Sequence, residues 1–242
     1  PCALCYLLLL TGGQACWGAS EWKTGLVGYW RFAQSDGIRV ADLSGNGLAG
    51  RISGGSVEGI PRSLVCNGFT TEVEIEESDS VAMSNALTVL AWVRPVTVKK
   101  RAIFGKPHTD PTFTTPMPGL FLSERGHLSF AAWQDKGGSK GLYEGASEIP
   151  RGAWTLVGAT YGDALVKLYV NGKEDGRSAS FSAMKVGPGP YYIGRTKAGS
   201  AMFKGLIGEV CLYRRALSAG EVAAYYEETR KTYPAGVPQP QS

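Results

Sequence analysis

Short runs in which apolar and polar residues alternate recur along most of the chain. In LVGYWRFA the alternation places Trp30 and Phe32 on the same face as Leu26. In TEVEIE, Val73 and Ile75 face one side while the glutamates face the other. A period of two is typical of a half-buried β-strand. Turn residues separate the runs about every ten residues, and the pattern therefore predicts an all-β domain.

One run lacks the alternation. LTVLAWVRP (87–95) is apolar on both faces, which predicts a central strand that is covered on each side and ends at Pro95. The Asn171-Gly172 dipeptide after ALVKLYV predicts a tight hairpin turn, because both residues tolerate positive φ. Further strands are predicted in AIFGK, GLFLS, HLSFAAW, AWTLVGATY, ALVKLYV, YYIGR and GLIGEVCLY.

A single helix is predicted near the C-terminus. Ser218 and Glu221 have the spacing of a capping box, and Leu217 and Val222 have that of a hydrophobic staple. We expect the helix to begin at Ser218 and to extend to about residue 231. The proline-rich segment 232–242 is expected to be a linker or a free tail.

The first twenty residues, PCALCYLLLLTGGQACWGAS, differ from the rest of the chain. An apolar run too short to cross a bilayer precedes small residues, which is the outline of a secretory signal peptide truncated at its start. We therefore expect a signal peptide at 1–20, a β domain at 21–231 and a secreted or cell-surface protein. No branched apolar residue directly precedes Cys16, so a lipid-modified N-terminus is the lesser alternative.

The charged residues and the cysteines argue against nucleic-acid binding and against a zinc site. The formal net charge is +4, but the basic residues are dispersed among acidic ones, and no basic stripe for nucleic acid is present. Cys66 and Cys211 are the cysteines of the predicted domain; they either form one disulfide or are buried as small apolar side chains. The predicted domain contains no CxxC pair and no Cys/His cluster, so zinc is not expected there.

Four segments, in this order, resemble one family: LVGYWRF with VADLSGNGLAG, LTVLAWVRP, AWTLVGATY with LVKLYVNGK, and FKGLIGEVCLYRRALSAGEV. Together they resemble the laminin-G-like jelly roll of the concanavalin A-like lectin/glucanase superfamily, over roughly residues 26–228. The resemblance implies a two-sheet antiparallel jelly-roll sandwich with one short C-terminal helix, often exported as a module of a larger protein. It does not imply one function, because this fold hosts binding and hydrolytic members.

A glycoside hydrolase is the first alternative function. A retaining glycosidase needs two carboxyl groups about 5 Å apart, and hydrolytic relatives supply them from an E-x-D-x-x-E strand. The segment EVEIEESD (72–79) has no aspartate in the middle place, so we expect an acidic solvent face there. If the chain is a hydrolase, its two catalytic carboxylates would be an unfamiliar pair drawn from Glu209, Asp135 or Glu144.

Calcium is the inorganic ligand that the sequence suggests. Asp42, Ser44 and Asn46 alternate along the turn DLSGNG, which would direct several oxygens at one cation, and relatives of this fold often carry calcium near such loops. The alternative is an Asx turn in which Asp42 caps its own backbone. Family members commonly have an aspartate before the glutamate of the last strand, and Gly208 stands there in this chain.

The expected function is that of a non-catalytic module that binds a glycan or an extracellular protein through loops at one end of the sandwich. Trp133, Asp135 and Tyr143 surround a glycine-rich segment, and Asp110 lies in the proline-rich segment HTDPTFTTPMP. An aromatic ring beside polar groups is suited to stack on a sugar. Trp133 also continues the strand pattern of HLSFAAW, which favours a core position for it. A purely structural module is the second alternative, and the oligomeric state is left open.

Glu209 is a lone acidic residue in the apolar run GLIGEVCLY. Its alternation places it with Cys211 and Tyr213 on one face, and places Val210 and Leu212 on the other. No partner carboxylate lies in its own motif. The resemblance implies that Glu209 is part of the fold signature rather than of catalysis. The question that the sequence leaves open is whether Glu209 ties down a neighbouring loop by hydrogen bonds.

Overall fold

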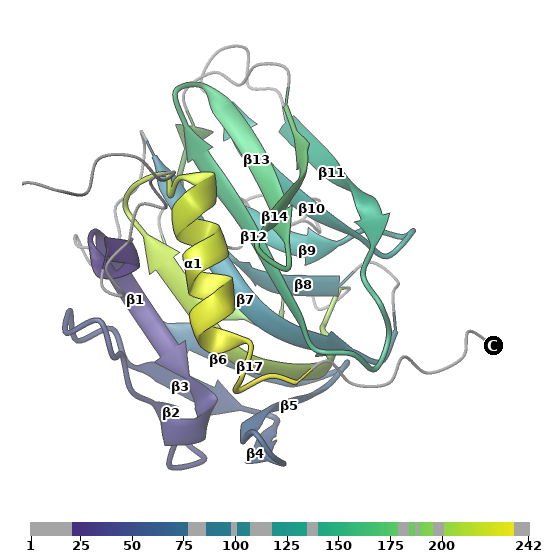
Figure 1. Ribbon diagram of the computed structural model, residues 1–242. Helices are drawn as coiled ribbons and strands as arrows, with labels where there is room; N and C mark the ends of the chain where they lie inside the picture. The colour runs from purple at the N-terminus through teal and green to yellow at the C-terminus, as the bar shows by residue number, and fades with distance from the viewer. Residues whose placement is uncertain are drawn as a thin grey trace, which may run out of the picture.

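The computed structural model describes residues 21–76, 86–97, 101–106, 118–134, 140–178, 184–186, 189–195 and 201–234. In these residues two antiparallel β-sheets pack face to face, and one α-helix covers the outside of one sheet (Figure 1). The predicted all-β sandwich with one short C-terminal helix is confirmed. No helix in the described residues is long and apolar enough to cross a membrane.

The eight-stranded sheet lies under the helix. Its strands run in the order β14-β13-β12-β7-β17-β5-β4, and β1 pairs with β17 beside this path. Their bounds are β14 (Lys173–Arg177), β13 (Leu165–Val170), β12 (Thr155–Gly162), β7 (Leu87–Pro95), β17 (Lys204–Tyr213), β5 (Ser63–Asn67), β4 (Ser56–Glu58) and β1 (Leu26–Arg31).

The nine-stranded sheet forms the other layer. Its strands run in the order β11-β10-β9-β8-β16-β6-β3-β2, with β15 paired to β10 beside this path. Their bounds are β11 (Lys140–Glu148), β10 (His127–Gln134), β9 (Gly119–Leu122), β8 (Arg101–Gly105), β16 (Tyr191–Ile193), β6 (Glu72–Ile75), β3 (Gly50–Ser53), β2 (Arg39–Val40) and β15 (Met184–Lys185).

Strand β7 is the central strand that its sequence predicts. It pairs with β12 on one side and with β17 on the other, and almost all of its side chains are buried. Val89 and Val93 face the space between the sheets, whereas Leu90 and Trp92 face the helix. A strand covered on both faces needs apolar residues at every position, and this requirement explains the missing alternation.

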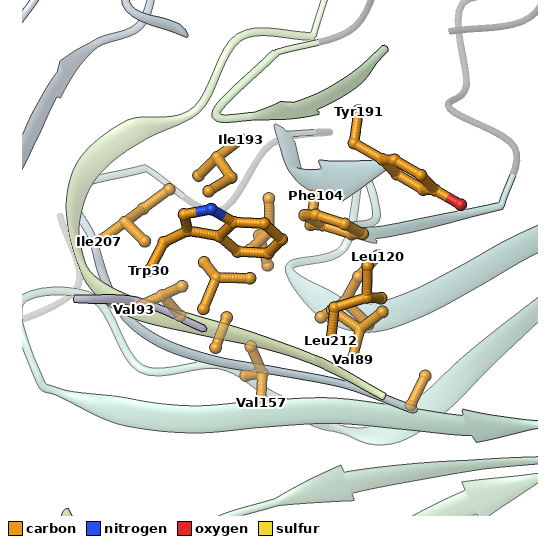
Figure 2. Packing of buried hydrophobic residues seen from close by; sticks show 14 of the residues in the cluster. Trp30, Val89, Val93, Phe104, Leu120, Val157, Tyr191, Ile193, Ile207 and Leu212 are labelled. Carbon is orange, nitrogen blue, oxygen red and sulfur yellow. The ribbon is translucent and has the colours of Figure 1, made fainter. Parts of the chain in front are cut away.

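The main core fills the space between the sheets. Trp30 stacks on Phe104 with ring centroids 6.2 Å apart, and Phe104 stacks on Tyr191 at 5.3 Å (Figure 2). The Trp30 indole N–H donates to the carbonyl of Leu48 over 2.6 Å, so its polar atom is satisfied inside the core. The prediction of Trp30 as a core residue is confirmed.

A second apolar cluster, called the helix-side cluster below, lies between the eight-stranded sheet and α1 (Ala219–Thr229). Ser218 is the N-cap, and it forms the predicted capping box with Glu221. Val222 and Tyr225 point from the helix toward the sheet. Two short 3-10 helices, η1 (Glu21–Lys23) and η2 (Phe32–Gln34), flank β1. Trp22 of η1, together with Trp92 and Trp154, belongs to this cluster.

The prediction for the first strand is wrong at Leu26. The pairing of β1 with β17 shifts register between Leu26 and Gly28, so one extra residue bulges out of the strand. Leu26 therefore packs against the helix-side cluster, whereas Trp30 and Phe32 lie between the sheets. Tyr29 points to the same side as Leu26.

Several strands are absent from the predicted set. β2, β3, β4 and β5 lie in a glycine-rich stretch whose short apolar runs carry little periodicity. β11 is the edge strand of the nine-stranded sheet, and glycines at 141 and 145 obscure its alternation. Tyr143 and Glu144 consequently lie within a strand and not in a loop. The predicted hairpin at Asn171-Gly172 is present, with φ of 50° and 78°.

Cys66 and Cys211 are both free and buried, so the disulfide alternative is wrong. Cys66 packs in the main core and Cys211 in the helix-side cluster, which places the two thiols on opposite faces of the eight-stranded sheet. Burial raises the pKa of both thiols. Tyr233, expected in the tail, is only 2% exposed and belongs to the packed domain.

Candidate functional site

Glu209 lies in β17 on the face that α1 covers. Ile207 and Val210 both point between the sheets, because the register against β7 shifts at Gly208 and leaves that residue as a bulge. The bulge turns Glu209 outward toward the helix, where it is 1% exposed. It is the single acidic side chain among the described residues that is fully buried.

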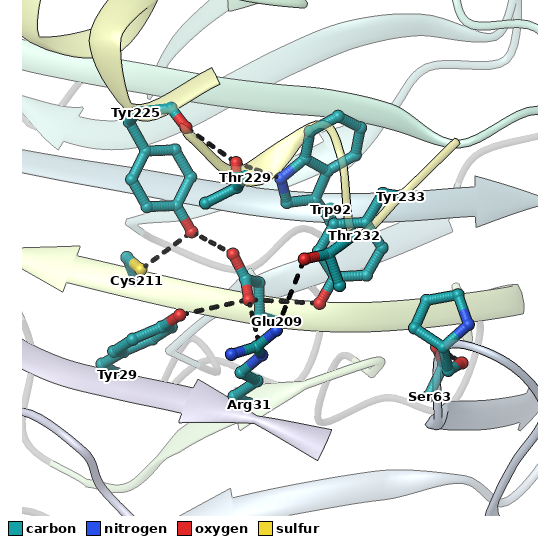
Figure 3. Close-up of polar contacts among 11 residues, drawn as sticks. Tyr29, Arg31, Ser63, Trp92, Glu209, Cys211, Tyr225, Thr229, Thr232 and Tyr233 are labelled. Atoms are coloured by element: carbon teal, nitrogen blue, oxygen red, sulfur yellow. Dashed lines mark hydrogen bonds and ion pairs between the residues drawn. The ribbon is translucent and has the colours of Figure 1, made fainter. Parts of the chain in front are cut away.

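Three tyrosine hydroxyls and one guanidinium surround the Glu209 carboxylate (Figure 3). Tyr225 donates over 2.5 Å, Tyr233 over 3.1 Å and Tyr29 over 3.2 Å. The Nε atom of Arg31 lies 3.5 Å from the carboxylate. A buried carboxylate is tolerated when its charge is paired and its lone pairs are used, as they are in this cluster.

These contacts join four parts of the chain. Tyr29 and Arg31 come from β1, Tyr225 comes from α1, and Tyr233 comes from the segment after the helix. Glu209 therefore ties the first strand, the helix and the C-terminal segment to β17. These contacts answer the question that the sequence leaves open: Glu209 does tie down its surroundings by hydrogen bonds, and the parts that it holds are a strand, a helix and the C-terminal segment.

Burial raises the pKa of the Glu209 carboxyl above its ordinary value. The hydrogen bond from Tyr225 and the positive charge of Arg31 act in the opposite direction. Burial and the adjacent carboxylate also raise the pKa of Tyr29 and of Tyr233. The tyrosines thus keep their protons and act as hydrogen-bond donors to Glu209.

The space in front of Gly208 is filled by Tyr233. A Cβ atom added to Gly208 would lie 2.2 Å from the Tyr233 ring. The same ring stacks on Trp92 at 4.9 Å and contacts Trp154 at 5.0 Å. An aspartate at position 208, which the resemblance leads one to expect, would collide with this ring, so the packing of Tyr233 requires a residue without a Cβ atom there.

A hollow of about 270 Å³ opens beside Glu209. We call it the polar hollow, and its lining residues are Trp22, Lys23, Tyr29, Arg31, Glu209, Glu228, Thr229 and Thr232. A second hollow of about 220 Å³, called the apolar hollow, is lined by Trp22, Lys23, Leu26, Tyr29, Leu43 and Ser44. Three residues line both hollows, so the two are neighbours beside β1, and together they are called the β1 groove below.

The groove combines charged groups with aromatic rings. The indole N–H of Trp22 donates to Glu228 over 2.6 Å, and the Lys23 ammonium lies 5.4 Å from the centre of the Trp22 ring. Trp22 also meets Tyr29 edge-on at 6.3 Å. Hydrogen-bond donors, a carboxylate acceptor and ring edges therefore face one space, which suits a ligand that has both hydroxyl groups and C–H surface.

The loop with Asp42, Ser44 and Asn46 reaches this groove through Ser44. One Asp42 oxygen accepts from the backbone N–H groups of Tyr29 and Ser44, both over 2.9 Å, as in an Asx turn. The other accepts from the Ser44 hydroxyl and from the backbone N–H of Leu48. The described residues contain no group of three or more His, Cys, Asp or Glu that could hold a metal ion. Calcium at this loop stays a prediction.

The other predicted binding residues are not brought together in the described part of the chain. Asp110, Asp135 and the side chain of Trp133 lie outside it. Tyr143 packs against the main core from strand β11. The acidic face of β6 is confirmed, and its Glu72 pairs with Arg195.

The carboxylates of Glu209 and Glu144 do not form a catalytic pair. Glu144 pairs with Ser129 on the outer face of the nine-stranded sheet, where it lies 3.5 Å from His127. Glu209 lies on the outer face of the other sheet. Packed sheets are about 10 Å apart, so both layers separate the two groups, and a retaining pair needs about 5 Å.

Three residues of the groove and its surroundings escaped the sequence analysis. Trp22 precedes the first strand and has no neighbours at a regular spacing. Tyr233 opens a proline-rich segment, which hides its packing. Tyr29 had a usable signal, because an aromatic residue beside Trp30 in a strand must point to the opposite face.

Solved structures of binding domains resemble this fold. The binding domain of Paraclostridial Mosquitocidal Protein 1 has a TM-score of 0.68 at 16% identity, over 86% of this chain and 53% of that one. The binding domain of Botulinum Neurotoxin DC, in complex with SialylT, has a TM-score of 0.65 at 11% identity, over 86% and 52%. The chain spans about half the length of these toxin domains, and at such identities the likeness concerns the fold alone.

A further structure is more similar in sequence. Domain 4 of AbnA, a GH43 extracellular arabinanase from Geobacillus stearothermophilus, is 26% identical, with a TM-score of 0.59 over 82% of this chain and 96% of that domain. No curated protein matches the chain in sequence. The family model of the laminin-G type matches residues 67–223, more than half of the chain. The two-layer fold and this match agree, and the chain belongs to the concanavalin A-like lectin/glucanases superfamily.

Proposed function

We propose that this chain is an exported, non-catalytic module that binds carbohydrate. The observation that carries the proposal is the likeness to domain 4 of AbnA, which extends over 96% of a domain described in complex with arabinotriose. A binding domain of a toxin in complex with SialylT, which has the same fold, supports it more weakly. The apolar run at residues 3–10 supports export.

The β1 groove supports carbohydrate binding through its chemistry. A sugar has C–H faces that pack on aromatic rings and hydroxyls that both donate and accept hydrogen bonds. Tyr29, which is half-buried, supplies ring surface, Lys23 supplies donors and Glu228 supplies an acceptor, while Trp22 is only 4% exposed and holds Glu228 in place. The end-loop residues Trp133, Asp135 and Asp110, together with Tyr143, are a second candidate surface.

The positions of the carboxylates support binding rather than hydrolysis. Glu209 is enclosed by three tyrosine hydroxyls and Arg31, so its lone pairs are used by the protein. Glu144 lies on the opposite outer face of the sandwich. A hydrolase would need an acid and a nucleophile on the same side of one sugar ring.

A glycan array tests the proposal, run with the purified domain in calcium and again in a chelator. We expect binding to a limited set of oligosaccharides, and arabino-oligosaccharides are included because of domain 4 of AbnA. A blank array in both conditions would contradict the proposal and favour a purely structural module. Release of reducing sugar by the wild type, lost in Glu209→Gln, would establish the hydrolase alternative instead.

A further inference from the structure

We propose that the β1 groove binds two consecutive sugar residues of different character. The polar hollow takes an unsubstituted residue, and the apolar hollow takes a neighbouring residue with a methyl-bearing substituent, either an acetamido group or the methyl group of a 6-deoxy sugar. This inference rests on the proposed function and adds to it the location of the site and the class of saccharide.

The polar hollow presents hydrogen-bonding groups with unused capacity. Only one carboxylate oxygen of Glu228 receives the indole N–H of Trp22, and its other oxygen has no partner within the described residues. Arg31 is partly engaged by Glu209 and Tyr233, and its contact with the hydroxyl of Thr232 is long, at 3.5 Å. The ammonium of Lys23 lies at the same opening. Two cationic donors and one carboxylate acceptor match the paired donor and acceptor character of vicinal hydroxyls.

The apolar hollow has a different lining. Leu26 and Leu43 form part of its wall, and Leu43 is 39% exposed. The rings of Trp22 and Tyr29 complete it, and the hydroxyl of Tyr29 is directed away to Glu209.

The hydroxyl of Ser44 has little hydrogen-bonding capacity left for a ligand in this hollow. Its hydroxyl lies 2.8 Å from the carbonyl of Val27 and 2.8 Å from Asp42, and it accepts from the side chain of Asn46. Lys23 also lines this hollow, but a sugar hydroxyl placed against Leu26 and Leu43 would have no partner there. A methyl group is favoured there, because its burial removes apolar surface from water.

The sizes of the hollows indicate one residue in each. Their volumes of about 270 Å³ and 220 Å³ both lie below the range of roughly 300–1,000 Å³ that is typical of pockets for drug-sized ligands. The hollows share Trp22, Lys23 and Tyr29, so a ligand in both would cross these side chains. A disaccharide unit fits this arrangement better than a single sugar.

Calorimetric titration with matched disaccharides tests the inference. The probes are β-1,4-linked glucose disaccharide, its counterpart with acetamido groups, and a disaccharide with a terminal 6-deoxy residue. We expect one substituted probe to bind about fourfold more tightly than the plain one, because burial of one methyl-sized group gives a preference of that order. The two substituted probes distinguish the two sources of the methyl group.

Two substitutions locate the preference. Leu43→Ser is expected to lower the affinity for the preferred substituted probe more than that for the plain probe, so that the affinity ratio approaches one. Ile38→Ser is the matched control, because Ile38 is also an exposed apolar residue, at 70%, and does not line the groove. Equal effects of Leu43→Ser and Ile38→Ser would overturn the location of the site.

The outcomes separate this inference from the proposed function. If the plain and substituted probes bind with equal affinity, the inference is wrong while carbohydrate binding stands. If Lys23→Ala leaves the affinity for every probe unchanged, sugar binds elsewhere and the inference is again wrong. If no saccharide binds in titration or on the array, both proposals fail together.

Discussion

The hydroxyl of Tyr225 donates to the carboxylate of Glu209 over 2.5 Å and thereby joins helix α1 to strand β17. The same hydroxyl lies 3.2 Å from the Cys211 sulfur, and the Tyr225 ring meets Trp22 edge-on at 5.0 Å. Hydrogen bonds to an ionised acceptor in a dry environment are among the stronger ones in proteins. The contact is therefore a principal link between the helix and the sandwich.

Tyr225→Phe should destabilise the domain by about 1–3 kcal/mol, because a buried carboxylate oxygen loses its donor. Urea unfolding followed by tryptophan fluorescence measures the change. Tyr226→Phe is the matched control on the same helix; its ring stacks on Trp92 with centroids 5.7 Å apart, and the substitution keeps that contact. We expect the control to change stability by less than about 0.5 kcal/mol. Equal losses in the two variants would contradict the role of the hydroxyl.

Glu209 should make stability depend on pH. Its folded pKa is raised above the ordinary value of 4.5, so the folded state binds more protons than the unfolded state above that pH. The contribution of Glu209 to stability is complete below pH 4.5 and declines as the pH rises through the folded pKa. The destabilisation caused by Glu209→Gln should consequently be largest near pH 4 and smaller near pH 8. Urea titrations of the wild type and of Glu209→Gln at several pH values measure this difference in stability. A difference that grows as the pH rises would mean that the pKa of Glu209 is lowered in the folded state, not raised.

Tyr233 should be as important as a residue of the main core. Tyr233→Ala removes a ring that contacts Trp92, Trp154 and Gly208, and we expect a loss of about 3–5 kcal/mol. Tyr233→Phe keeps the ring and removes only the interactions of the hydroxyl with Glu209 and Arg31, so its expected cost is about 1 kcal/mol. Differential scanning calorimetry of both variants checks whether Tyr233→Ala loses several times more stability than Tyr233→Phe. Two small and equal shifts would assign residue 233 to the tail after all.

The sequence was sufficient to predict the layers of the fold. Alternation in β6 and continuous apolarity in β7 report directly which faces are buried, and the capping box of α1 is a local signal. The bulges at Leu26–Gly28 and at Gly208 were not predictable in this way, because a bulge depends on the partner strand and leaves no periodic trace.

The groove was harder to predict for a related reason. Its residues come from η1, β1, α1 and the segment at Thr232, which are up to about two hundred positions apart in the sequence. Only long-range packing brings Trp22 to Glu228, and no spacing rule connects them. The end-loop hypothesis relied on local composition instead, and it gave no strand to the segment after the glycine-rich turn, where Tyr143 lies in β11.

The cysteines offer a direct check of the packing. Cys66 and Cys211 are free and buried, and their raised pKa values keep the thiols protonated. The described domain should therefore show no labelling by a thiol reagent when folded, and two labelled thiols in denaturant without any reductant. Mass spectrometry of the segment from residue 21 onward measures both states. Labelling in denaturant that occurs only after reduction would show that the two cysteines form a disulfide.

Substitution of Asp42 distinguishes the two roles proposed for its carboxylate, which are to accept hydrogen bonds in an Asx turn and to bind calcium. Asp42→Asn keeps the shape of the side chain but replaces one acceptor oxygen by a donor NH₂ group. In one orientation this group faces the Leu48 N–H and the Ser44 hydroxyl, and in the other it faces the N–H groups of Tyr29 and Ser44. We expect the substitution to lower the melting temperature equally in calcium and in chelator, as an Asx turn requires. A wild-type melting temperature that rises with calcium, and fails to rise in Asp42→Asn, would establish a calcium site.

The contacts of Glu209 have a consequence for the order in which the domain is assembled. Tyr29 and Glu209 are 180 positions apart, and Tyr233 lies a further 24 positions along the chain. During synthesis β1 leaves the ribosome early, but its partner strand β17, the helix and Tyr233 follow only at the end. A nascent chain therefore cannot close this sandwich until almost the whole domain has emerged, and its first strand needs protection from non-native pairing throughout that interval.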